Sequence, residues 1–136
     1  MAGSLRDRIA DYINKAAAKG FKWGENDCAL FANNHLAEHY GYEDLAKPFR
    51  GKYTDYKSGL ELINQAGYKD AIDMADKHLT RVNRPHVGDI ALYADGRCLG
   101  ICLGAYCYFL TASFITRIPN RLALKFWRLS WQQQSL

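Results

Sequence analysis

The residues best suited to chemistry in this sequence form a short turn that ends in a cysteine. Residues 20–34 read GFKWGENDCALFANN, and we expect a helix from Asp27 onward. Cys28 then lies in the first helical turn, where free backbone N–H groups and the helix dipole stabilise a thiolate and lower the pKa of a thiol. Asp27 is a candidate N-cap at this helix start, beside any oxyanion site. Cys28 is therefore a candidate nucleophile, the alternative being a small buried side chain.

A thiolate nucleophile usually needs an imidazole to share its proton, and the sequence holds four histidines. His35 and His39 follow Cys28 on one helix by about 10 and 16 Å, too far for a hydrogen bond at ~1.5 Å per residue. We interpret both as partly buried or inter-helix histidines. Their i,i+4 spacing also fits a metal site, but no third ligand is evident and we expect no metal. His78 is interpreted as a surface residue, whereas His86, in RPHVGD, is a turn residue and the best-placed substitute base.

Three further cysteines, Cys98, Cys102 and Cys107, fall within ten residues of strand-like sequence. Their C-x3-C-x4-C spacing is not that of a zinc ribbon, so we interpret them as reduced thiols that pack as small hydrophobes. A redox-active thiol domain, with Cys28 close to Cys98 or Cys102, is a weaker interpretation because the sequence holds no C-x-x-C motif.

The elements that must position these residues divide the chain into a helical half and a strand-rich half. Ser4 and Asp7 form a capping-box pattern at the start of the first helix, and Gly41 and Gly67 are candidate stops for the second and third. Residues 41–54 are expected to form an ordered loop, and residues 68–78 are ambiguous, with another short helical turn as one interpretation. Helices are predicted over 5–19, 27–40 and 55–66, and strands over 79–82, 90–94, 98–104, 107–113 and 122–129.

Helices followed by an antiparallel meander predict an α+β domain in which N-terminal helices pack on one side of an antiparallel sheet. We expect a single domain over residues 1–136, with an N-terminal helix (1–19), a helical part (20–78) and the sheet (79–136). The net charge of +4 includes no basic run of five or more, so nucleic acid is not an expected partner. The N-terminus has no apolar h-region and no segment is apolar enough to span a bilayer, so we expect no signal peptide, no membrane span and synthesis in the cytoplasm.

Three segments together resemble the NlpC-type branch of papain-like cysteine peptidases, most closely the small NlpC-like proteins encoded among bacteriophage tail genes. They are WGENDCALFA (23–32), RPHVGDIALY (84–93) and CLGICLG (98–104), and the resemblance covers roughly residues 20–130 in element order. It implies a papain-like fold with Cys28 at the nucleophile position and Gly88–Asp89 at the opening of the first strand. The family's His-Val-Gly-Ile-Tyr-x-Gly strand carries the base, and a third polar residue on the next strand orients it.

The sequence departs from this pattern at the base. Cys98 stands where the family has its histidine, and Thr111 falls near the third position. A thiol cannot replace imidazole, because its ordinary pKa is about two units higher and it changes charge in the opposite sense on deprotonation. The resemblance therefore predicts a catalytically degenerate domain.

Such a domain would serve as a structural or assembly component of a phage tail, made in the host cytoplasm and carried in the virion without a cofactor. Its partners would be other tail proteins, met through aromatic side chains of residues 48–56 and 126–136, although Trp127 and Trp131 could instead close the core. The alternative is an active cysteine hydrolase that cleaves peptidoglycan peptide bonds during DNA entry, with His86 or a histidine of a partner chain as base.

Overall fold

Four helices precede the sheet, and each begins where a side chain caps it. The computed structural model describes residues 3–112 and 114–130. The N-cap side chains accept hydrogen bonds from backbone N–H groups three residues on, which satisfies donors that a helix start leaves free. The helices are α1 (Leu5–Lys19), α2 (Cys28–Tyr40), α3 (Tyr56–Gln65) and α4 (Ala71–His78), capped by Ser4, Asp27, Asp55 and Asp70.

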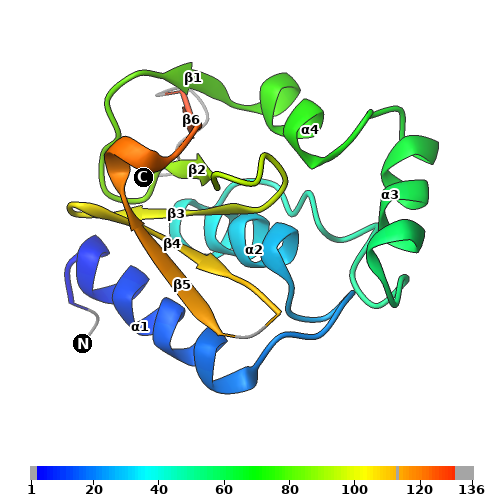
Figure 1. Cartoon of the computed structure of the whole chain (residues 1–136), viewed down its shortest axis with the longest axis horizontal. Coiled ribbons are helices and arrows are strands. Elements are labelled where there is room, and N and C mark those ends of the chain that lie inside the picture. The colour runs from blue at the N-terminus through cyan, green and yellow to red at the C-terminus, as the bar shows by residue number, and fades with distance from the viewer. Residues whose placement is uncertain (1–2, 113, 131–136) are drawn as a thin grey trace.

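The strands form one antiparallel sheet in which the last strand lies between the first two. The order is β1-β6-β2-β3-β4-β5, so β6 lies between β1 and β2. Trp127 of β6 is paired with Arg81 on one side and Ile90 on the other. The strands are β1 (Thr80–Val82), β2 (Ile90–Leu92), β3 (Leu99–Leu103), β4 (Tyr106–Leu110), β5 (Ile115–Pro119) and β6 (Lys125–Arg128) (Figure 1).

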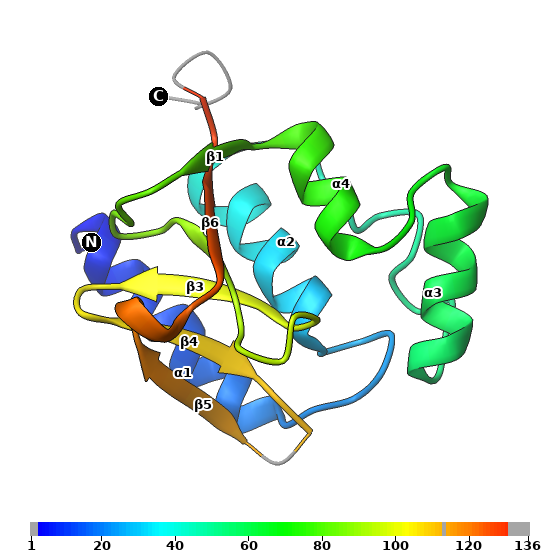
Figure 2. The same ribbon diagram turned by 45° about the horizontal axis from the view of Figure 1, so that its top comes forward.

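The two faces of β3 serve different parts of the core. Leu99 and Ile101 point toward the helices, where Leu99 packs with α2 and Trp127, and Ile101 packs with Phe31 of α2 and with residues of α1. Cys98 and Cys102 belong instead to a third cluster, against which Cys28 of α2 also packs. In both ribbon views α2 runs along β3, while α3 lies farthest from the sheet (Figures 1 and 2).

The predicted α+β class and the three predicted helices are confirmed. The ambiguous residues 68–78 contain α4, which is longer than the short helical turn considered for them. No strand is predicted over Ile115–Pro119, yet β5 pairs there with β4 as the edge of the sheet. Four of its five side chains are half-buried, Arg117 is exposed, and the strand ends in a proline, so neither a periodic nor a continuous apolar pattern marks it. A 3₁₀ turn over Asn120–Leu122 shortens the strand expected from residue 122. In the described part of the chain no helix has the length and apolarity needed to cross a membrane.

Gly100→Ala is expected to destabilise the sheet at β3. A Cβ there would lie 2.3 Å from the Tyr108 carbonyl oxygen and 2.4 Å from the Phe109 ring. Overpacking against backbone should lower the free energy of unfolding by about 3 kcal/mol, measured by urea denaturation. Gly96→Ala is the matched control, because its Cβ would meet nothing within 4 Å and only its φ of +76° opposes the change, at a cost of about 1 kcal/mol. Equal losses in the two variants would contradict this account.

Candidate functional site

The start of α2 is held by the buried carboxylate of Asp27. This side chain is only 1% exposed. One oxygen accepts from the Leu30 N–H at 3.0 Å, and the other accepts from the Gly24 N–H at 2.9 Å and the Tyr53 hydroxyl at 2.5 Å. The predicted N-cap is therefore confirmed, and Cys28 is the first residue of the helix. Burial and the hydrogen bond to Asp27 raise the pKa of Tyr53, so Tyr53 remains a donor.

The sulfur atoms of Cys28 and Cys98 meet at this helix start. Cys98 lies just before β3 and is buried, whereas Cys28 is half-buried. Cys28 packs against the cluster that contains Cys98, and the Cys98 side chain and the Leu99 N–H are the two groups that favour a negative charge on its sulfur. The Cys98 Sγ lies 3.7 and 3.9 Å from the carbonyl oxygens of Leu99 and Leu110, which compete with Cys28 for its single S–H. The structure therefore brings together two of the residues that the resemblance singled out, Cys28 and Cys98.

The surroundings of the two sulfurs favour a thiolate on Cys28 and a thiol on Cys98. The hydrogen bond from Cys98 holds the pKa of Cys28 below the ordinary thiol value, against the opposing effects of burial and of Asp27. The Leu99 N–H acts in the same direction as Cys98. The bond to Cys28 and burial both raise the pKa of Cys98, whose other neighbours are carbonyl oxygens that only accept. Within this pair, the negative charge is therefore favoured on Cys28 and the proton on Cys98.

His35 and His39 lie along α2, away from these sulfurs, as predicted. His35 is fully buried, and its Nε2 lies 2.8 Å from the Gly88 carbonyl oxygen. Because a carbonyl only accepts, Nε2 carries the hydrogen, and the Nδ1 atom 2.8 Å from Nδ1 of His39 must accept from that ring. The pair connects α2 to the chain before β2. Within residues 3–112 and 114–130, no group of three or more His, Cys, Asp or Glu side chains is arranged to hold a metal ion.

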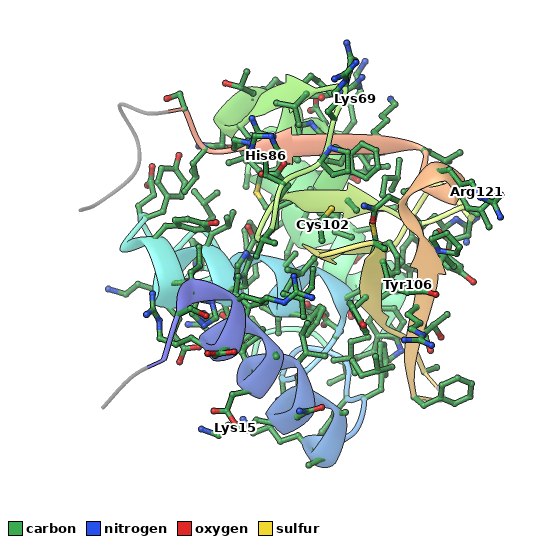
Figure 3. All side chains as sticks on the ribbon, turned by 90° about the vertical axis from the view of Figure 1, so that its left-hand side faces the viewer. Lys15, Lys69, His86, Cys102, Tyr106 and Arg121 are labelled. Atoms are coloured by element: carbon green, nitrogen blue, oxygen red, sulfur yellow. The ribbon has the colours of Figure 1, made fainter. Side chains whose placement is uncertain are left out.

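His78 differs from its expected place at the surface, since it is half-buried and lies 2.7 Å from the Tyr68 hydroxyl. His86 is exposed and lies at the wrong end of β3 to serve as a base. The neighbouring Gly88 N–H donates to the Cys102 carbonyl, and Cys102 and Cys98 are about 13 Å apart along the strand at ~3.3 Å per residue. Figure 3 labels His86 and Cys102, with His86 close to the ribbon of β6. The structure does not bring His86 to Cys28.

Thr111 lies beside the site in the chain, but its hydroxyl is used elsewhere. It follows Leu110, whose carbonyl oxygen accepts from Cys98. The Thr111 hydroxyl donates to the Phe114 carbonyl at 2.7 Å and lies 3.2 Å from the Thr116 hydroxyl. It therefore stabilises the turn between β4 and β5.

The Gly88–Asp89 pair of the motif has a structural role. A Cβ on Gly88 would lie 2.1 Å from the Tyr40 hydroxyl, and its φ of +92° also favours glycine. Asp89 is 3% exposed and accepts from Arg128 Nε at 2.9 Å and Nη2 at 2.8 Å, as well as from the His86 N–H at 2.7 Å. These contacts connect the start of β2 to β6.

A cleft that no sequence pattern indicated opens beside Cys28. It lies between the first half of α2, the helices α3 and α4, and the β2–β3 turn, and its cavity volume is about 90 Å³. Arg97 of that turn lies over the Tyr56 ring, 5.5 Å from its centroid, and both residues line the cleft with Cys28. Most of the remaining wall is apolar and includes Leu30, Phe49, Leu60, Ile63, Ile72 and Met74. The cleft suits a small, mainly apolar group beside Cys28.

Stability should fall as the pH falls through the range in which His35 resists protonation. Burial lowers the pKa of His35 from 6.5 to about 4. The unfolded chain therefore binds this proton first, and the free energy of unfolding should drop by about 3 kcal/mol between pH 6.5 and pH 4, at ~1.4 kcal/mol per unit. Urea denaturation at several pH values measures the drop, and His35→Gln should flatten it. An equally steep drop in that variant would assign it to other groups.

Cys98→Ala is expected to raise the pH at which Cys28 becomes reactive. The variant removes the S–H donor that stabilises the Cys28 thiolate. The rate of iodoacetamide alkylation at Cys28, followed by peptide mass spectrometry from pH 5 to pH 10, should reach its half-point about one unit higher than in the wild type. Cys102→Ala, which removes a buried thiol of the same strand, should leave the half-point unchanged. A half-point that is unchanged or lower in Cys98→Ala would contradict the assigned thiolate.

Comparison with known proteins places the chain in a family without adding an activity. No curated protein matches the sequence. A family model described as "Domain of unknown function (DUF6950)" matches residues 3–129, which include every helix and strand of the fold. The chain therefore belongs to the DUF6950 family.

Proposed function

We propose that this chain is a structural component of a bacteriophage tail, built on an NlpC-type papain-like fold that does not hydrolyse. The observation that carries the proposal is the contact between Cys28 and Cys98. Cys28 begins a helix and lies beside Cys98, the residue before a neighbouring strand, and this contact supports the arrangement that we propose from the motifs. The partner residue, however, is one that cannot perform the reaction.

The chemistry of peptide hydrolysis explains why this pair disfavours it. A thiolate that attacks an amide needs a nearby acid to protonate the leaving amine, and an imidazolium does this near neutral pH. Cys98 cannot do so efficiently, because its raised pKa makes it a weak proton donor. His86 is at the far end of β3, and His35 is buried against Gly88. The described residues therefore support binding better than hydrolysis.

A tail component needs a surface for its neighbours, and the rim of the cleft supplies the best candidate. Tyr56 is 45% exposed and stacks beneath Arg97. Tyrosine and arginine are residue types that often anchor protein interfaces. Trp127 cannot serve in this way, because it is fully buried and its Nε1–H donates to Asp76 at 2.9 Å. Trp131, the other tryptophan expected at an interface or in the core, is outside the described residues.

The second candidate function is an active cysteine hydrolase that cleaves peptidoglycan during DNA entry. The lowered pKa of Cys28 and its place in the wall of the cleft favour it. Because the described histidines lie elsewhere, this function needs a base from a partner chain.

Cys28→Ala, introduced into a phage that carries this gene, separates the two functions. The structural proposal expects the protein in purified particles or tail intermediates, and plating efficiency within about threefold of the wild type, because only the thiol is lost. Arg97→Ala with Tyr56→Ala should reduce incorporation by about tenfold or more if the rim is the contact surface. Mass spectrometry of particles and plaque counts provide the measurements.

Two outcomes would contradict the proposal. Normal particles that carry Cys28→Ala but fail to infect would support the hydrolase. Absence of the protein from both particles and tail intermediates would rule out the structural role.

A further inference from the structure

Two pairs of cysteine thiols are in contact in this molecule, and they differ in access. Cys102 and Cys107 face each other across β3 and β4 with their sulfurs 3.5 Å apart, and both are at most 1% exposed. Cys28 packs against the cluster that contains Cys98 and interacts with the Cys98 thiol, but Cys28 is half-buried and lines the cleft. Only the second pair therefore combines sulfur contact with an approach for a reagent.

We propose that Cys28 and Cys98 are a redox-active dithiol that reacts with low-molecular-weight disulfides through the cleft. Cys28 is the attacking cysteine and Cys98 is the resolving cysteine. The inference goes beyond the role in a tail and is independent of it, because it requires only the two sulfurs and the cleft.

The reaction proceeds in two thiol–disulfide exchanges. The Cys28 thiolate attacks one sulfur of the small disulfide, the S–S bond of that molecule breaks, and one thiolate leaves. The Cys98 sulfur then attacks Cys28 Sγ, the mixed disulfide breaks, and the second small thiolate leaves while the Cys98 proton passes to a released thiolate. Two protein thiols are oxidised to one disulfide and one small disulfide is reduced to two thiols, so electrons and protons balance.

The contacts fit these roles. The Leu99 N–H and the Cys98 S–H both point to Cys28, which supports its charge before attack. Once Cys28 is in the mixed disulfide it carries no charge, so the chief influence that holds the proton on Cys98 is removed. Arg97 places a positive charge on the wall of the same cleft, which favours an anionic disulfide such as glutathione disulfide.

The test uses glutathione disulfide with the full-length chain, followed by thiol quantification and peptide mass spectrometry. The expected product is an intramolecular Cys28–Cys98 disulfide, which dithiothreitol reverses. Cys98→Ala should instead accumulate glutathione on Cys28. Cys28→Ala should lose its thiols at about one tenth of the wild-type rate or more slowly still. Cys102→Ala is the matched control and should form the Cys28–Cys98 disulfide at the wild-type rate.

Every other product in the wild-type chain overturns the inference, so the result does not depend on the stability of the variants. A Cys102–Cys107 disulfide would show that the buried pair is the reactive one. Stable glutathionylation of Cys28 would show that Cys98 does not resolve it. An intermolecular disulfide, or four thiols that persist in excess glutathione disulfide, would show that the pair does not react as proposed.

Discussion

The buried Asp27 carboxylate is the interaction on which the site depends. A charge that is 1% exposed is costly unless donors surround it, and Gly24, Leu30 and Tyr53 supply three of them. These donors come from the loop before α2, from α2 itself and from the segment before α3. One carboxylate thus sets the first turn of α2, which carries Cys28, and one wall of the cleft beside it. Helix capping here stabilises tertiary structure as well as a helix end.

The second half of α2 is connected to the sheet by a different set of contacts. His35 hydrogen-bonds to the Gly88 carbonyl, and the Gly88 N–H donates to the Cys102 carbonyl on β3. Asp89 then joins the same segment to Arg128 of β6. Because α2 is held at both ends, its position along β3 is determined, and Cys28 comes to lie opposite Cys98. The contact between the sulfurs is therefore a consequence of the register between a helix and a strand.

The parts of this structure that depend on local chemistry could be predicted from sequence, and those that depend on tertiary packing could not. Ser4, Asp27 and Asp55 cap helices through residues three positions away, so their patterns are visible in a short window. The strand β5 owes its existence to pairing with β4 and has no pattern of its own. The cleft needs α3 and α4 in place, and the sequence around α4 was ambiguous, indicating a short helical turn at most.

His86 shows a related limit of sequence reasoning. A histidine just before a strand can lie at either end of the neighbouring strand, and only the pairing of Gly88 with Cys102 places it far from Cys28. Cys98 could be singled out only through the resemblance of residues 98–104 to a family motif, and not through the periodicity of the strand.

On the proposed NlpC-type fold, a thiol at the position of the imidazole has two linked physical effects. It removes the only group in this arrangement that could protonate a leaving amine near neutral pH. It also retains a hydrogen-bond donor to Cys28, since the S–H of Cys98 and the N–H of Leu99 still stabilise the thiolate. A stabilised thiolate that has no acid beside it is poorly suited to cleaving amides, because nothing protonates the leaving amine. It is well suited to disulfides, because a thiolate leaves without prior protonation. Loss of hydrolysis and a capacity for thiol exchange would then both follow from one residue, Cys98. The cleft beside Cys28 gives a reagent access to this pair, whereas the sulfurs of Cys102 and Cys107 are buried.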